Sequence, residues 1–160
     1  MSEPTMDRPA IRRVADALVR HGATGEIRLL PDSTHTAAAA AATLGCEVGA
    51  IASSLVFDAD GEAILVVTSG AHRVDVAKVA AEHGLPSLRR ATPDFVRTAT
   101  GQTIGGVAPV GHPVPVRTYV DSWLDRHDSV WAAGGHPHAV FATSYAELLA
   151  LTGGTPTDVE

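Results

Sequence analysis

The stretch formed by residues 101–115 constrains the fold more than any other part of the chain, because it contains four glycines and three prolines. A regular helix or a central strand does not tolerate that composition, since proline lacks a backbone donor and glycine adds conformational freedom. Ile104, Val107 and Val110 are interspersed among them and favour an ordered loop over a disordered one. We therefore expect residues 101–113, called the glycine loop below, to form one wall of a small-molecule pocket. A long structural connection is the competing interpretation.

Helices and strands are predicted on both sides of this loop from apolar spacing and from capping residues. Helical spacing and glycine stops predict helices at 10–21, 37–44, 74–83, 93–98 and 144–151. Residues 32–36 offer several N-cap candidates for the second of these helices. Runs rich in β-branched residues predict strands at 26–30, 50–57, 63–68, 116–120, 129–132 and 138–142.

The order of these elements predicts an α+β fold with a curved, mixed, barrel-like β-sheet surrounded by helices, because strands and helices do not alternate regularly. The turn at 58–61 (Asp-Ala-Asp-Gly) joins two of the strands into a hairpin. We expect one domain over residues 1–160, with a core at about 10–154 and frayed termini at 1–7 and 154–160.

Charge and composition exclude several classes of function. The formal net charge of −6 argues against a protein that grips a long nucleic-acid backbone, so no DNA partner is expected. The single cysteine, Cys46, predicts a reducing compartment, and no apolar run is long enough to span a bilayer. We expect a cytoplasmic protein with no membrane partner. The basic pairs at 12–13 and 89–90 suit either a solvated face or an RNA end.

Common catalytic patterns are missing from the chain. It has no nucleotide-binding glycine fingerprint, and Ser53 and Ser54 lie in a predicted strand without the nucleophile elbow of a serine hydrolase. His136 and His138 are two residues apart and would share one face of a strand, but the sequence offers no clear further metal ligands. We expect no metal and no cofactor. Asp75 and Lys78 have the spacing of a surface ion pair on a helix.

Several segments in order resemble the YbaK family, the domain associated with bacterial prolyl-tRNA synthetases. The resemblance begins at residues 36–45 and 51–57, continues through Arg73-Val74-Asp75 with Lys78 and through residues 105–112, and ends at 133–136 and the last helix. It covers about residues 10–158, and its most specific element is the GxxxP pattern from Gly105 to Pro109.

The resemblance implies a free-standing hydrolase that removes a wrongly attached small amino acid from tRNA by substrate-assisted ester hydrolysis. Its partner would be the aminoacyl-adenosine at the tRNA acceptor end, with a transient contact to an aminoacyl-tRNA synthetase. The resemblance assigns catalytic positions to Gly105, Gly106 and Pro109. Substrate-binding positions would be Thr36, Ile51, Ser53, Ser54, Val107, Gly135 and His136.

One position departs from the family. Members commonly carry lysine where this chain has Ser53, and that lysine is thought to hold the acceptor end. A lost charge-assisted contact is worth about 1.5–3 kcal/mol, or roughly a factor of 10–150 in binding. The serine at this position leaves a binding module without turnover open beside the editing hydrolase. A metal-dependent hydrolase, which would need bound zinc, is a third hypothesis.

Overall fold

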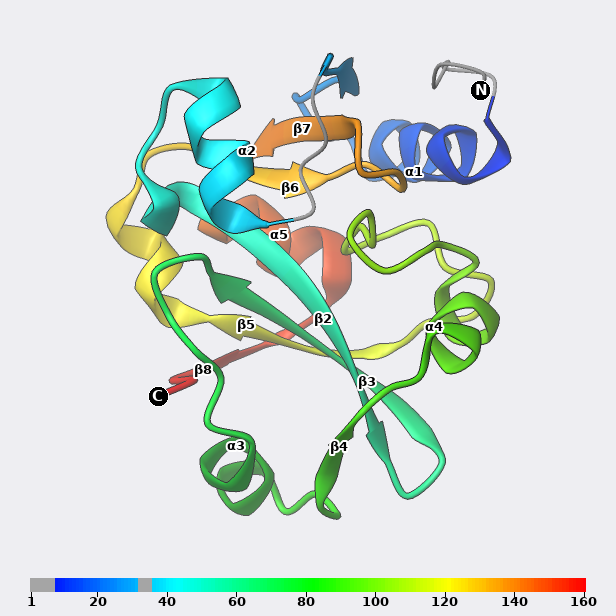
Figure 1. Ribbon diagram of the computed structural model, residues 1–160, viewed down its shortest axis with the longest axis vertical. Coiled ribbons are helices and arrows are strands. Elements are labelled where there is room, and N and C mark those ends of the chain that lie inside the picture. Colours follow the sequence, from blue (N-terminus) through cyan, green and yellow to red (C-terminus); the bar gives the residue numbers. More distant parts are fainter. Residues whose placement is uncertain (1–7, 32–35) are drawn as a thin grey trace.

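A computed structural model describes residues 8–31 and 36–160 (Figure 1). Helix α1 (Pro9–Arg20) and the short strand β1 (Arg28–Leu29) come first, followed by α2 (Ala37–Leu44) and the 3-10 helix η1 (Val48–Ala50). The other strands are β2 (Ile51–Ala59), β3 (Glu62–Ser69), β4 (Leu88–Arg90), β5 (Arg117–Asp121), β6 (Val130–Ala133), β7 (Ala139–Thr143) and β8 (Thr155–Thr157). The other helices are α3 (Val76–His83), α4 (Pro93–Thr100), η2 (Ser122–Arg126) and α5 (Tyr145–Thr152).

The strands form one mixed sheet in the order β1-β7-β6-β2-β3-β5-β8, with β4 paired to β2. The β2–β3 and β6–β7 neighbours are antiparallel, whereas β2–β6, β3–β5 and β5–β8 are parallel. Within the described residues this path has two ends, so the sheet curves without closing into a barrel. The predicted α+β fold with a mixed sheet surrounded by helices is confirmed.

The predicted hairpin is present because its turn residues accept left-handed backbone angles. Asp60 has φ of 53° and Gly61 has φ of 94°, as the tight hairpin turns require. The Asp58 side chain also accepts a hydrogen bond from the Gly61 amide at 2.7 Å. The two strands extend further than the sequence predicts, over 51–59 and 62–69.

Side-chain caps begin four of the α-helices. The hydroxyls of Thr36, Thr92 and Ser144 and the carboxylate of Asp75 each accept a hydrogen bond from an amide three residues later. The N-cap candidates at 32–35 lie outside the described residues. The predicted pairing of Asp75 with Lys78 is wrong: Asp75 caps α3, and the Lys78 ammonium lies 2.9 Å from an Asp158 carboxylate oxygen.

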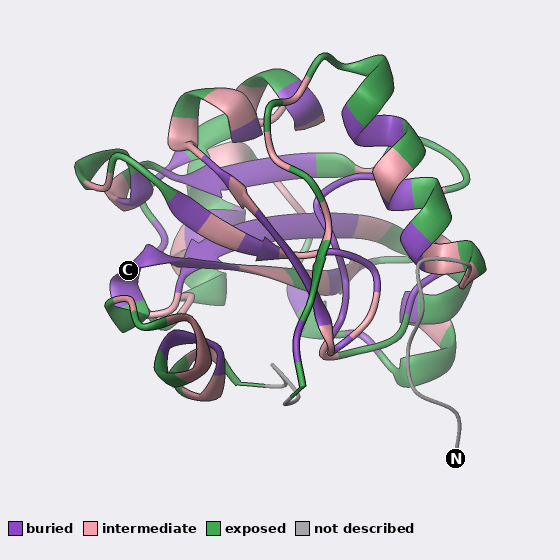
Figure 2. Cartoon of the chain, turned by 90° about the horizontal axis from the view of Figure 1, so that it is seen from above, coloured by how far each residue is buried: buried purple, intermediate pink, exposed green. Residues whose placement is uncertain are grey.

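Buried side chains lie on both faces of the sheet. One cluster packs beneath α1 and α5 and includes Leu65, Phe141 and Leu148, and a second packs beneath α3 and includes Ile64 and Val79. Figure 2 shows the buried residues concentrated along the strands, while the helices present one buried face and one exposed face. None of the described helices is long and apolar enough to cross a membrane.

The end of the chain corrects the expectation of a frayed tail at 154–160. Residues Thr155–Thr157 form β8 beside β5, and Val159 is fully buried. The amide of Asp75 donates to the carbonyl of Val159 at 2.6 Å, so this segment also fixes the loop before α3. These residues are mostly polar and include a proline, so the sequence does not predict a strand here. They form one because they pair with β5. The predicted frayed segment at 1–7 lies outside the described residues.

Candidate functional site

A cavity of about 870 Å³ lies against the middle of β2. Its wall is contributed by α2, β2, the loop before α3, the β4–α4 region, the glycine loop, and strands β6 and β7. Apolar side chains dominate this wall: Ala37, Ala40, Leu44, Ile51, Val107, Trp131, Ala132 and Val140. A mostly apolar hollow with a few polar groups is the usual form of a small-molecule site.

The cavity exists because β2 lacks a neighbouring strand along part of one edge. This strand pairs with β3 along most of its length, but its other edge pairs with β6 only at 51–52 and with β4 only at 57–59. Residues 53–56 therefore have no strand on that side in the described part of the chain. The Gly70 amide donates to the Ile51 carbonyl at 2.8 Å, so the backbone groups of Ile51 and of every second residue after it point toward β3. By that alternation the peptide groups of Ser54 and Val56 face away from β3, toward the gap.

The Ser54 hydroxyl is the least satisfied polar group in this wall. Its oxygen is buried and has no hydrogen-bond partner among the described residues, although Ser53 and Ser54 both line the cavity. A buried hydroxyl without a partner costs about 1–3 kcal/mol, and such groups in native structures call for an explanation. Ser54 is therefore a candidate contact for a bound ligand, which would have to displace neighbouring atoms because the oxygen has almost no exposed surface.

The glycine loop is ordered and contributes Ile104, Gly105 and Val107 to the cavity wall. Gly105 has φ of 92°, a left-handed conformation that favours glycine. Its amide makes no hydrogen bond to another described residue, which leaves it available to a bound group. Pro109 is buried and lies outside the cavity lining.

Gly106 lies behind this wall and packs against the turn between β6 and β7. Its amide already donates to the Thr103 carbonyl at 3.0 Å. A Cβ atom at Gly106 would lie 2.5 Å from the carbonyl carbon of His136 and 2.7 Å from the nitrogen of Pro137. Of the three positions to which the resemblance assigns catalysis, only Gly105 therefore reaches the cavity.

The turn that contains Gly135 and His136 supports the loop without lining the cavity. Gly135 has φ of 97° and packs against α1, where a Cβ would meet the Ala10 carbonyl oxygen at 3.0 Å. The prediction that His136 and His138 lie on a strand is wrong, because both precede β7. Their rings are 5.6 Å apart, and the Nδ1 of His138 lies 3.0 Å from the Leu30 carbonyl oxygen. The described residues contain no group of three or more histidine, cysteine or acidic side chains able to hold a metal ion.

Thr36 does not line the cavity in the described structure, but it positions a helix that does. Its hydroxyl accepts from the Ala39 amide at 3.1 Å and its side chain is exposed. The next residue, Ala37, lines the cavity together with Ala40 from the following turn. Ile51 and Val107 both line the cavity, as Ser53 and Ser54 do.

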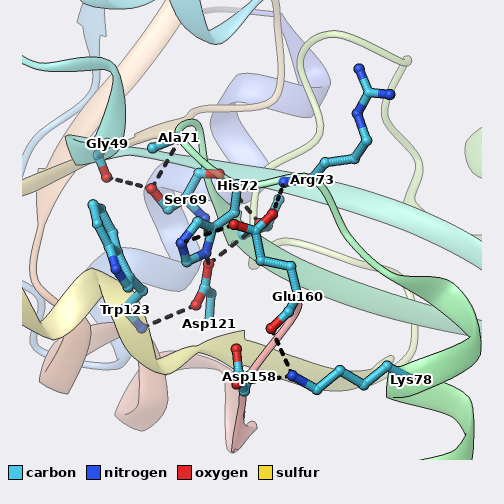
Figure 3. A network of polar contacts seen from close by, with 11 residues as sticks. Gly49, Ser69, Ala71, His72, Arg73, Lys78, Asp121, Trp123, Asp158 and Glu160 are labelled. Carbon is cyan, nitrogen blue, oxygen red and sulfur yellow. Dashed lines mark hydrogen bonds and ion pairs between the residues drawn. The ribbon is translucent and has the colours of Figure 1, made fainter.

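Two exposed arginines, Arg73 and Arg90, are the cations of the wall, and no carboxylate lines it among the described residues. Figure 3 shows the Arg73 guanidinium extending away from a polar network that holds its backbone. In that network the Arg73 amide donates to a Glu160 carboxylate oxygen at 2.9 Å. The fully buried Asp121 accepts from the Ser69 amide at 3.0 Å and contacts His72 Nδ1 at 2.8 Å.

The sequence did not identify these arginines as site residues. In the sequence Arg90 appears only as part of a basic pair, because strand β4, which carries it to the cavity, is three residues long and gives no periodic signal. Arg73 stands out in the sequence only as part of the family pattern. The apolar residue Trp131 was missed for a related reason, since its strand pairs with β2 through a parallel contact of two residues.

Comparison with known proteins places the chain in a family. Residues 31–151 match the model of the aminoacyl-tRNA editing domain. A crystal structure described as "a putative trans-editing enzyme for prolyl tRNA synthetase" is 46% identical, with a TM-score of 0.89, covering 96% of this chain and 98% of that one.

Two curated relatives agree with this match. The uncharacterized protein YwhH of Bacillus subtilis (strain 168) is 33% identical over 72% of this chain and 74% of its own length. A proline–tRNA ligase of Nitratidesulfovibrio vulgaris (strain DP4) is 30% identical over 76% of this chain but only 23% of the ligase. The family resemblance drawn from the sequence is thereby confirmed, and the chain belongs to the aminoacyl-tRNA editing domain family.

Proposed function

We propose that this protein is a free-standing deacylase that hydrolyses the ester of mischarged aminoacyl-tRNA in the cavity beside β2. The observation that carries the proposal is that one apolar cavity is lined both by Gly105, whose amide bonds to no described residue, and by Ser54, whose hydroxyl has no partner among them. Membership of the editing-domain family supports the same reaction.

The reaction needs little from the protein beyond positioning. Water adds to the aminoacyl carbonyl, the ester C–O bond breaks, and the products are the free amino acid and the terminal ribose hydroxyl of the tRNA. The Gly105 amide would donate to the oxyanion that forms at the carbonyl, and the neighbouring ribose hydroxyl or a substrate side chain would orient the water. Amide donors of this kind typically contribute about 2.7–4 kcal/mol.

Arg73 and Arg90 would replace the cation that Ser53 lacks. Both guanidinium groups belong to the cavity wall and are exposed, so they can reach the phosphates of the acceptor end without desolvating. Loss of one such contact costs about 1.5–3 kcal/mol, or roughly a factor of 10–150 in binding. In this proposal the protein acts in the cytoplasm and contacts an aminoacyl-tRNA synthetase only transiently.

The apolar wall favours a small, uncharged amino acid. The test is deacylation of a panel of Ala-, Cys-, Ser- and Thr-charged tRNAs, measured against the buffer rate. We expect faster release from at least one member, and Arg73→Ala to raise KM by about 10- to 150-fold with little change in kcat. Arg117→Ala is the control, because Arg117 lies outside the cavity lining and lies 3.3 Å from Glu62. Buffer rates for all four tRNAs would reject the proposal.

A second candidate is a binding module that holds the aminoacyl end without turnover, and the serine at position 53 favours it. Saturable binding of a non-hydrolysable aminoacyl-adenosine analogue, with no deacylation on the panel, would select this function. Absence of both binding and deacylation would reject the cavity as a site for this ligand.

A further inference from the structure

One buried side chain, that of Gln102, spans the glycine loop from within. Gln102 is 1% exposed. Its Nε2 donates to the Val110 carbonyl at 3.1 Å, and its Oε1 accepts from the Ala108 amide at 2.6 Å. The amide of Gln102 itself donates to the Thr100 hydroxyl at 3.0 Å, which ties the start of the loop to the end of α4.

The part of the loop that lines the cavity lies between these anchor points. Residues 104, 105 and 107 reach the wall, and the Gln102 side chain bonds to the chain on their far side, at residues 108 and 110. The Gly106 amide is already bonded to Thr103. Few other side chains hold this segment: His112 Nε2 donates to the Ala108 carbonyl at 2.9 Å.

We propose that Gln102 is a positioning residue, whose side-chain amide holds the glycine loop so that Gly105 stands at the cavity wall. The proposal rests on the proposed function for its effect on catalysis, and on geometry alone for its effect on the loop. An amide suits this place because the loop presents one donor and one acceptor to the same side chain. Leaving either of them buried and unbonded would cost about 1–3 kcal/mol.

The variant Gln102→Glu tests whether the loop needs both a donor and an acceptor from this side chain, because ionisation removes the donor. A protonated carboxyl has the shape of the amide and supplies both an acceptor for Ala108 and a donor for Val110. The ionised carboxylate has no donor and would face the Val110 carbonyl. Since burial raises the pKa of a carboxyl above its usual value of about 4.3, the introduced group should lose its proton within an accessible pH range.

The other ionisable groups beside the loop do not differ between the two proteins. They are His112, bonded to Ala108, and Arg13 on α1, whose guanidinium donates to the Gly101 carbonyl at 3.1 Å. The ratio of variant to wild-type rate at each pH therefore isolates the introduced carboxyl. Subtraction of the buffer rate removes the pH dependence of the ester itself.

We expect kcat of Gln102→Glu, divided by that of the wild type, to fall at least about tenfold between pH 5.5 and pH 8, with KM nearly constant. Gln102→Leu should be impaired at every pH. Val159→Ala is the control, because it removes buried volume from the second cluster, which contains no residue of the glycine loop, and should give a ratio independent of pH. A flat ratio for Gln102→Glu, or a normal kcat for Gln102→Leu, would overturn the proposal.

Hydrogen exchange separates this proposal from the proposed function, since it needs no activity. If the wild type deacylates nothing on the panel, the exchange of amides 103–110 is compared between Gln102→Glu and wild type at pH 5.5 and pH 8. Protection that matches wild type at low pH and is lost at high pH supports the positioning role. Equal protection at both pH values contradicts it.

Discussion

Gly106 leaves less room for a Cβ atom than Gly101 or Gly111 of the same loop, and its replacement by alanine tests how the loop packs against the fold. The added Cβ would lie 2.5 Å and 2.6 Å from the carbonyl carbon and Cα of His136. These are main-chain atoms, so no side-chain rotation relieves the contact. Either the loop or the β6–β7 turn must move.

The expected cost is that of overpacking a close-packed interior, about 1–3 kcal/mol. For a domain of this size each kcal/mol lowers the melting temperature by about 2–4 °C, so Gly106→Ala should melt about 2–12 °C below the wild type. Because the loop carries Gly105, the deacylation rate should fall even at temperatures where the variant is still fully folded. Scanning calorimetry and the deacylation assay measure the two effects separately.

Two further variants identify the cause. Gly153→Ala is the stability control: Gly153 has φ of +63° and nothing within 4 Å of its added Cβ, so the variant pays a conformational cost while leaving the loop untouched. It should lose stability and keep its activity. Gly106→Ala combined with His136→Ala should be as impaired as Gly106→Ala, because the clash is with backbone. Rescue by His136→Ala, or normal melting and activity of Gly106→Ala, would refute the reasoning.

Three more predictions concern single side chains. Ser54→Ala should unfold in urea at the wild-type concentration or slightly above, because its hydroxyl bonds to nothing in the described protein, yet lower kcat/KM by about tenfold; a large loss of stability would contradict this. Burial lowers the pKa of His112 from 6.5, so the unfolded chain takes up the proton more readily, and stability should fall as pH drops below 6.5 and through the lower folded pKa. His112→Gln should lose less unfolding free energy than the wild type between pH 7.5 and pH 5.5, as measured by urea unfolding. An equal loss in the two proteins would show that His112 is not the group responsible. Asp75→Ala removes the cap of α3 and should lower the free energy of unfolding by about 1 kcal/mol, whereas Asp75→Asn should melt near the wild type. An alanine variant that melts at the wild-type temperature would argue against the cap.

Local chemistry explains which elements the sequence predicts correctly. The hairpin follows from Asp60 and Gly61, which accept positive φ, and α4 and α5 follow from Thr92 and Ser144, which cap them. Helix α2 has the predicted bounds because Thr36 caps it and Gly45 ends it in a left-handed conformation. Each of these signals acts over a few residues, so it can be read without the tertiary structure.

The missed features depend on contacts between distant segments. Strand β8 contains a proline and two threonines, and it is a strand only because β5 lies beside it. The role of Gln102 is invisible in the sequence, since its partners become its neighbours only when the loop closes. The same holds for the gap beside Ser54, which arises where β6 leaves β2 before β4 joins it.

The central claim is that deacylation takes place in the cavity beside β2, and one measurement tests it most directly. The Ala-, Cys-, Ser- and Thr-charged tRNAs are incubated with the wild type and with Ala133→Phe, which places a ring in the cavity from a partly buried position on β6. If the cavity is the site, the wild type releases the amino acid faster than the buffer does, and the variant folds but loses this activity. Equal rates for the two folded proteins would place the chemistry outside this cavity.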